Sequence, residues 1–428
     1  MSALTRGRRR GAARGNRDLS LNSQFRGGGY RGRSTPGVET DPVTLPPDRD
    51  ILDGILSHTV KVLDKPRVVS GEKVAIRELE YISSYNWVDA KEPTIIVPGS
   101  PRNWKNKALP FRVPLDSGTV FVDQNGYRMP DSPLLPLFRA VDVVSEGSTD
   151  VNIDWPSVDF VTDRNGLRKL LRWIDSGGGE GSREKRTFRI DTQLAGSNTV
   201  LFSRWQERTI EQAQGGSGFS FEKETTKPAK GCERSTGHHR IIKYDLDGLT
   251  MVVRFEVDAC IEDVDDLADQ LSGLSVSSSS QTGDAKESSE PANSPKVIRA
   301  GSQVKQENII EMTTRSERNA ANFNWTEAYP QLYLSRTPHH FLAIHNRGTF
   351  YEITKRKLNS PEMKTIEEAA EVSMKKLRVL LGAIQDEVVT HGKGGRLSLI
   401  CQNDKLEVRE RESQDSLIPD EAMERFRV

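Results

Sequence analysis

The feature that most limits how this chain can fold is a set of three short segments in which carboxylates interrupt apolar, strand-like runs. Their sequences are Gly218-Phe219-Ser220-Phe221-Glu222, Arg254-Phe255-Glu256-Val257-Asp258 and Ile309-Ile310-Glu311-Met312-Thr313. An unpaired charge is costly to bury, so acids in several such runs predict a shared counter-ion. Carboxylate oxygens of this kind favour a divalent metal ion.

The spacing within the second segment supports this prediction. Side chains of a strand over residues 250–259 alternate, so Glu256 and Asp258 are expected on one face and Phe255 and Val257 on the other. For a single segment, a solvated strand face is the simpler interpretation. Three such segments in one chain favour a site.

The length and composition of the chain exclude several classes of protein. Its 428 residues suffice for one large domain or two ordinary ones. No apolar run approaches the roughly 20 residues of a membrane span, and the N-terminus lacks the apolar core of a secretory signal, so we expect no membrane partner. The cysteines, Cys232, Cys260 and Cys401, are scattered and few. We therefore expect no disulfides and a location in the nucleus or the cytoplasm.

Charge is unevenly distributed along the chain. Residues 1–37 hold nine arginines and one acid, giving +8, and the other 52 basic and 60 acidic residues give −8. We predict a disordered Arg/Gly- and Pro-rich arm over residues 1–50. Arg26, Arg31 and Arg33 lie in a glycine-rich run typical of RNA-binding arms. A nuclear-import signal or a solubilising tail explains this composition equally well.

Residues 51–428 are predicted to form one domain with a disordered, acidic, Ser-rich insert at 262–300. We predict helices at 164–176, 205–214, 325–334 and 363–390. Strands are predicted at 72–85, 94–97, 188–202, 241–244, 250–259, 308–314, 341–344, 349–353 and 397–408. The first helix carries Leu167, Leu170, Leu171 and Ile174 on one face.

Four motifs, in order along residues 150–355, resemble those of the eukaryotic decapping nucleases. This family removes incomplete or NAD caps and includes the partner protein of the nuclear 5′→3′ exoribonuclease. The motifs are Arg164 at the head of a helix, Gly218–Glu222, Glu256-Val257-Asp258, and Glu311-Met312-Thr313 followed downstream by Gln331. The resemblance implies a mixed α/β fold with two mixed β-sheets flanked by helices, and a core similar to that of the PD-(D/E)XK nucleases.

The resemblance also implies roles for these residues. Glu222, Asp258 and Glu311, with the backbone carbonyl of Met312, would bind Mg²⁺ or Mn²⁺, and Glu256 would hold a second ion or its water. Arg164 and Gln331 would position the phosphates of an RNA 5′ end. The implied activity is metal-dependent hydrolysis that removes incomplete, NAD or triphosphate caps in RNA quality control, with 5′→3′ exoribonuclease activity as an option.

One position departs from the family pattern. The family has a lysine two residues after the motif-four glutamate, where this chain has Thr313. A threonine cannot stabilise developing phosphoryl charge as an ammonium can, and losing one such donor costs about 10²–10³ in rate. Lys305 or Arg315 could substitute for it. The alternative interpretation is a catalytically weakened RNA-binding pseudoenzyme, or a scaffold for an exoribonuclease partner.

Two further patterns have simpler explanations. Asp265-Asp266-Leu267-Ala268-Asp269 matches the aspartate motif of prenyl diphosphate synthases, but it occurs once and beside a Ser-rich insert, so we expect a solvated loop. The pairs His238-His239 and His339-His340 are expected at ordinary polar positions. Adjacent side chains of a strand point to opposite faces and seldom share one ion.

Overall fold

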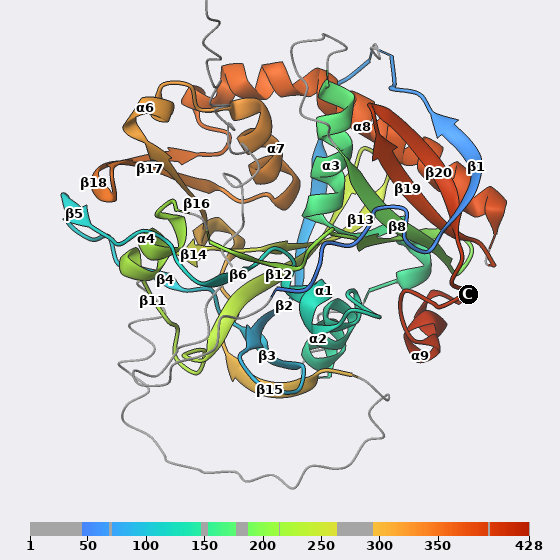
Figure 1. Ribbon diagram of the computed structural model, residues 1–428, viewed down its shortest axis with the longest axis horizontal. Helices are drawn as coiled ribbons and strands as arrows, with labels where there is room; N and C mark the ends of the chain where they lie inside the picture. The colour runs from blue at the N-terminus through green and yellow to red at the C-terminus, as the bar shows by residue number, and fades with distance from the viewer. Residues whose placement is uncertain are drawn as a thin grey trace, which may run out of the picture.

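The computed structural model describes residues 45–67, 71–146, 153–176, 187–213, 215–262, 294–392 and 394–427. Within them, two β-sheets are flanked by helices (Figure 1). The predicted α/β class with two mixed sheets is therefore confirmed. No helix in the described part of the chain is long and apolar enough to cross a membrane.

The larger sheet has eleven strands and a mixed direction. β7 is parallel to both of its neighbours, β9 and β13, and β15 is parallel to β3, whereas the other pairs are antiparallel. In spatial order its strands are β1 (Ile55–Leu63), β20 (Lys405–Arg411), β19 (Arg396–Gln402), β8 (Phe188–Ala195), β9 (Thr199–Arg204), β7 (Phe160–Asp163), β13 (Thr250–Glu256), β12 (Ser235–Leu246), β2 (Ile76–Val88), β3 (Thr94–Gly99) and β15 (Lys296–Gly301).

The second sheet has seven strands, and the chain passes directly from β13 of the larger sheet into β14 (Ala259–Cys260) of this one. In spatial order they are β11 (Thr226–Lys227), β4 (Asn103–Trp104), β14 (Ala259–Cys260), β16 (Ile309–Ser316), β17 (His339–Asn346), β18 (Thr349–Lys357) and β5 (Phe111–Arg112). A small separate pair joins β6 (Thr119–Phe121) to β10 (Ile210–Gln212). The passage from β13 to β14 places Glu256 and Asp258 where the two sheets meet.

Helices cover both faces of the larger sheet. On one face α3 (Arg164–Asp175), α7 (Trp325–Ser335) and α8 (Lys364–His391) pack against one another, and on the other lies α2 (Leu135–Ser145) (Figure 1). The remaining helices are short: α1 (Gln124–Arg128), α4 (Gly218–Thr225), α6 (Glu317–Ala320) and α9 (Asp420–Met423). Single 3₁₀ turns occur at Trp155–Ser157, Gln306–Asn308, Pro361–Met363 and Glu424–Phe426.

The core follows the apolar periodicity of the sequence. The predicted face of α3 is buried at all four positions, Leu167, Leu170, Leu171 and Ile174. Each such leucine contributes about 1.5–3 kcal/mol by leaving water. This packing fixes the orientation of α3, and therefore the position of the arginine with which the helix begins.

Three sequence-based predictions of local structure were wrong. The first carboxylate segment, Gly218–Glu222, is the start of helix α4 and not a strand, because a remote carboxylate accepts hydrogen bonds from its first-turn amides, as described below. The helix predicted at 205–214 is absent, since Ile210–Gln212 pairs with Thr119–Phe121 as a strand. The predicted insert at 262–300 is too long at its end, because Lys296–Gly301 forms strand β15 on the edge of the larger sheet.

Much of the predicted disordered sequence lies outside the described residues. This holds for residues 1–44 of the arm, which include Arg26, Arg31 and Arg33, and for residues 263–293 of the insert, which include Asp265–Asp269.

Candidate active site

The four acids singled out in the sequence lie on elements that meet between the two sheets. Glu222 is on α4, Glu256 ends β13, Asp258 lies between β13 and β14, and Glu311 is on β16. Glu222, Asp258 and Glu311 are each less than a tenth exposed, and Glu256 is half-buried. We call these four residues the acid group.

The carboxylates of the acid group repel one another. The pKa of Glu222 is raised well above its ordinary value, first by burial and then by the charges of four other carboxylates, Asp258, Asp116, Glu311 and Glu256. Burial also raises the pKa of Glu256, to about 7, although the cations Arg204 and Arg164 oppose the shift. Buried like charges raise one another's pKa in this way unless a cation compensates them.

One cation reaches the acid group directly. Arg164 Nη1 donates to Glu311 Oε2 at 3.1 Å and also lies 3.2 Å from Ser335 Oγ on α7. The side-chain amide of Gln331, also on α7, donates to the other Glu311 oxygen, Oε1. The structure thus brings the predicted Arg164 and Gln331 together on one carboxylate. Their predicted contacts with phosphate stay a prediction.

Asp258 fixes the second sheet against the end of the first. Its Oδ2 accepts a hydrogen bond from the Met312 amide at 2.7 Å, which ties the acid to strand β16. Met312 therefore contacts the acid group through its backbone amide. The metal-binding role predicted for its carbonyl oxygen stays a prediction.

Asp116 is a site residue that the sequence analysis missed. It lies in the connection before β6, and its carboxylate accepts hydrogen bonds from the backbone amides of Phe219, at 3.2 Å, and Ser220, at 2.8 Å. These are amides of the first turn of α4, which have no partner within the helix. Asp116 therefore orients the helix that carries Glu222. Nothing local in the sequence marks this contact, which spans more than 100 positions.

Arg254 and Asp163 form the other support that the sequence did not reveal. The Arg254 guanidinium holds both carboxylate oxygens of Asp163, at 2.6 and 2.9 Å, and the arginine is fully buried. Arg254 also donates to the Pro133 carbonyl and to the Tyr85 hydroxyl. Asp163 immediately precedes α3, so this pair fixes the start of the helix and with it Arg164.

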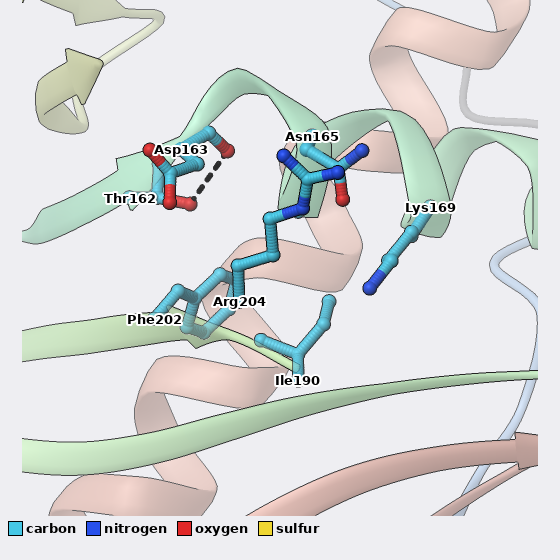
Figure 2. A pocket seen from close by; sticks show the side chains of 8 residues that line it. Thr162, Asp163, Asn165, Lys169, Ile190, Phe202 and Arg204 are labelled. Atoms are coloured by element: carbon cyan, nitrogen blue, oxygen red, sulfur yellow. Dashed lines mark hydrogen bonds between the residues drawn. The ribbon is translucent and has the colours of Figure 1, made fainter. Parts of the chain in front are cut away.

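Figure 2 shows the hollow beneath the first turn of α3, where Asp163, Arg204 and Lys169 lie around Phe202 and Ile190. The hollow has no space for a water-sized molecule. Lys169 is buried here and donates to the backbone carbonyls of Arg189 and Trp205, and burial lowers the pKa of its amine to about 7. These side chains therefore support the helix and do not form a ligand pocket.

The position of the missing lysine is occupied by a hydrogen-bonded pair. Thr313 Oγ1 lies 3.1 Å from His340 Nε2 on β17. The imidazole is buried against the rings of Phe323 and Trp325. Burial lowers the pKa of His340 to about 3, and Arg356 and Arg315 add to the effect. His340 is consequently neutral at physiological pH and supplies no positive charge in place of the lysine.

The two residues considered as substitutes for this lysine lie as follows. Arg315 is stacked over the Phe323 ring, 5.3 Å from its centroid, and donates to the Thr314 carbonyl. Lys305 is exposed at the start of a 3₁₀ turn. Substitution of either residue for the lysine stays a prediction.

The histidines of the other adjacent pair on β12 make ordinary core contacts, although His239 is the cross-strand partner of Glu256. His238 Nδ1 is 2.8 Å from the side-chain oxygen of Asn86, whereas the ring of His239 packs on Tyr85. Burial lowers the pKa of both rings well below the usual range. Both are therefore neutral core residues.

The acid group fits a hard divalent cation by donor type and by charge. Buried carboxylate oxygens raise the pKa of Glu222, and a bound cation would relieve this repulsion. The arrangement is nevertheless open, because in the described part of the chain no three His, Cys, Asp or Glu side chains approach closely enough to hold one ion together. The Glu311 carboxylate instead accepts hydrogen bonds from Arg164 and Gln331.

Comparisons with known proteins agree with this architecture. A family model described as a domain of unknown function (DUF8563) matches residues 57–426, and a search of curated proteins found no match. Among solved structures, the fold is similar to that of Rai1 from S. pombe, with a TM-score of 0.53 and 13% identity over 82% of this chain and 99% of that one.

Rai1 from Scheffersomyces stipitis gives a similar result. A crystal structure of that protein with (3′-NADP)⁺ and a calcium ion matches with a TM-score of 0.52 and 12% identity, over 84% of this chain and 99% of that one. At such low identity the likeness shows the fold. The resemblance to the decapping nucleases is therefore confirmed at that level.

Proposed function

The chain belongs to the family described as a domain of unknown function (DUF8563), and on its Rai1-like fold we propose that it is a metal-dependent hydrolase of RNA 5′ ends. Its substrates would be RNAs with incomplete, NAD or triphosphate caps. Trimming of the RNA after cap removal, an exoribonuclease partner and a nuclear or cytoplasmic location belong to the same proposal.

The observation that carries this proposal is the repulsion within the acid group. Burial, together with the charges of four other carboxylates, raises the pKa of one acid, Glu222. Charged groups that oppose one another inside a fold usually serve a site, because they cost stability. Glu222 and Asp258 are the two acids that would first engage an ion, since Arg164 already neutralises Glu311.

Each residue has a chemical part in the proposal. Glu222, Asp258 and Glu311 would hold Mg²⁺ or Mn²⁺, and Glu256 would hold a second ion or a proton near neutral pH. When bound, such an ion neutralises phosphate charge and lowers the pKa of a bound water. Arg164 and Gln331 lie beside Glu311, where their donors could turn from the carboxylate to a phosphate.

The second candidate is a pseudoenzyme that binds RNA or holds an exoribonuclease. Two observations favour it: Thr313 and a neutral His340 stand where a cation is expected, and Arg164 is paired with Glu311. Both features reduce the positive charge available to a transition state.

The experiment that tests the proposal is a product assay with Mn²⁺. The purified chain is incubated with RNAs that carry a 5′ monophosphate, a triphosphate, an NAD cap or an unmethylated cap, and released nucleotides are measured. We expect metal-dependent release from at least one RNA, and loss of release in Glu222→Gln. The matched control is Glu224→Gln, an exposed glutamate on the same helix that pairs with Lys107.

If no RNA in this panel yields product while the RNA still binds, the hydrolase proposal fails and the scaffold remains. If release persists with EDTA, or in Glu222→Gln, then the activity does not come from the acid group.

A further inference from the structure

We propose that a second site, separate from the acid group, binds a phosphate monoester on a ligand of nucleotide size, with Arg411 as its main anchor. The site is a cleft of about 800 Å³ between the end of β20, the strands β8 and β9, and the segment that follows β20. Its volume lies within the range of ordinary small-molecule pockets. We call it the Arg411 cleft.

Arg411 is buried with donors that have no partner. Its exposed fraction is 8%, and neither Nε nor Nη2 has a hydrogen-bond partner among the described residues. An unsatisfied charged group of this kind is expensive to bury, so a native fold normally provides it with an anion. Burial lowers the pKa of Arg411, which is consistent with this cost.

Asp191, a half-buried acid that lines the cleft, already accepts hydrogen bonds from other residues. Asp191 accepts hydrogen bonds from Arg189 Nε at 2.6 Å and from Arg189 Nη2 at 3.1 Å, and it also accepts from Ser398 Oγ at 2.6 Å. Its oxygens are thus occupied, although it lines the same cleft as Arg411. The guanidinium fork of Arg411 is therefore left for a ligand.

The lining of the cleft is mixed in charge, with four arginines, Arg411 included, and five aspartates. Arg396 and Arg204 contribute to the wall, and Arg49 lies over the ring of Trp205, 5.0 Å from its centroid. Asp123 lies 3.6 Å from Arg204 and offsets that charge. A guanidinium fork matches the oxygens of a phosphate and binds them by paired, charge-assisted hydrogen bonds.

The rim of the cleft limits the length of the ligand. Three exposed carboxylates, Asp131, Asp415 and Asp420, lie around it. They would repel a continuous polyanion but can accept hydrogen bonds from ligand hydroxyls. A single phosphate on a nucleoside, either free or as the terminal nucleotide of an RNA, fits this distribution of charge.

The test measures binding without a divalent metal, so it does not depend on the proposed hydrolase. Isothermal titration in EDTA uses three probes: inorganic phosphate, AMP, and a short RNA with and without a 5′ phosphate. We expect saturable binding of AMP, weakened about tenfold or more in Arg411→Gln, because charge-assisted hydrogen bonds are lost. The matched control, Arg427→Gln, removes an exposed arginine near the C-terminus and should bind as the native chain does.

The probes distinguish the source of the phosphate. Binding of AMP with none of the 5′-phosphorylated RNA indicates a free nucleotide, and binding of both indicates a strand terminus as well. Either result supports the site.

A second measurement protects the test against a variant that does not fold. In the native chain, AMP should slow amide hydrogen exchange over residues 411–419 with the same midpoint as the titration. Equal affinity in native protein and Arg411→Gln would overturn the proposal, as would AMP binding without protection of this segment. Loss of AMP binding in Glu222→Gln would assign the ligand to the acid group instead.

Discussion

The guanidinium of Arg164 lies 3.1 Å from the carboxylate of Glu311, and both side chains are only 7% exposed. The arginine opens α3 on the larger sheet, and the glutamate belongs to β16 of the second sheet. The pair therefore connects the two halves of the fold at the place where the acids gather. It also determines how much negative charge remains for an ion.

Removing one member of this pair should be costly. In Arg164→Gln, Glu311 would stay buried beside other carboxylates without a cation, and breaking a buried pair in this way lowers the free energy of unfolding by about 3–5 kcal/mol. Urea unfolding of both proteins at pH 7.5 without divalent metal measures the difference.

Arg172→Gln is the control for this prediction. Arg172 lies on the same helix and donates to Glu327 at 2.7 Å, but its side chain is 30% exposed. A more exposed pair contributes about 1 kcal/mol or less. Equal losses in the two variants would show that burial does not strengthen the Arg164–Glu311 pair.

Glu256 should give the stability of the protein a pH dependence. The pKa of its carboxyl is about 7 in the fold against an ordinary value of 4.5. Between these values the unfolded chain has lost this proton and the fold has kept it. Stability therefore falls as pH rises from about 4.5 to 7 and is constant above, by about 3 kcal/mol for this group.

Glu256→Gln removes this contribution, since glutamine does not titrate. Denaturant unfolding at a series of pH values should show that the contribution which falls between pH 4.5 and 7 is smaller in the variant. The remaining slope comes from Glu222, whose pKa is also raised, and with the opposite sign from the buried His238, His239 and His340, whose pKa values are lowered. Curves of equal slope would mean that Glu256 is solvated and has an ordinary pKa. If the acid group binds Mn²⁺, adding the ion should reduce the loss of stability that the native chain shows between pH 4.5 and 7.

The sequence predicted elements whose apolar positions repeat with a helical or strand period. The face of α3 from Leu167 to Ile174 is one example, and α8 begins and ends within one residue of its predicted limits. Such patterns are local, so they can be recognised without knowledge of the tertiary contacts.

Contacts between distant segments could not be predicted in this way. Phe219 and Phe221 alternate with polar residues as in a strand, yet Asp116, about 100 positions earlier, stabilises a helix there. Arg254 and Asp163 are likewise joined only because β13 and β7 are parallel neighbours. The acids themselves could be identified in the sequence. The hydrogen-bonded ion pair that Arg164 forms with Glu311 could not be predicted from it.

Asp116 can be tested by separating its charge from its hydrogen bonds. Asp116→Ala removes both, so the first turn of α4 loses its acceptor, which we expect to cost about 1–2 kcal/mol. Asp116→Asn keeps an acceptor and removes a charge that raises the pKa of Glu222. We therefore expect the asparagine variant to be close to the native chain in stability and the alanine variant to be lower.

Hydrogen exchange at Phe219 and Ser220 reports the helix turn directly and should accelerate in Asp116→Ala alone. Asp245→Ala is a control, because Asp245 accepts from the Gly248 amide in an exposed hairpin turn far from α4 in sequence. If both Asp116 variants lose equal stability, the charge of Asp116 and not its hydrogen bonding supports α4.

Thr313→Lys tests whether the missing lysine is all that the acid group lacks for efficient cap removal. A lysine here would extend from the same strand face as Glu311, beside a neutral His340 that offers no competing charge. An added electrostatic donor at the reacting phosphate is expected to raise the rate of Mn²⁺-dependent cap removal by about 10²–10³. Thr314→Lys is the control, since neighbouring residues of β16 project to opposite faces.

Two arginines near residue 313, Arg315 and Arg356, determine how a lysine there could raise the rate of cap removal. Arg315 and Arg356 already lower the pKa of His340, so a third cation must be stabilised by the carboxylates, chiefly Glu311. A lysine that pairs with Glu311 would displace Arg164 from it and free the arginine for phosphate. A folded, Mn²⁺-binding Thr313→Lys protein with no gain in rate would therefore count against a hydrolase and leave the RNA-binding scaffold as the function of this fold.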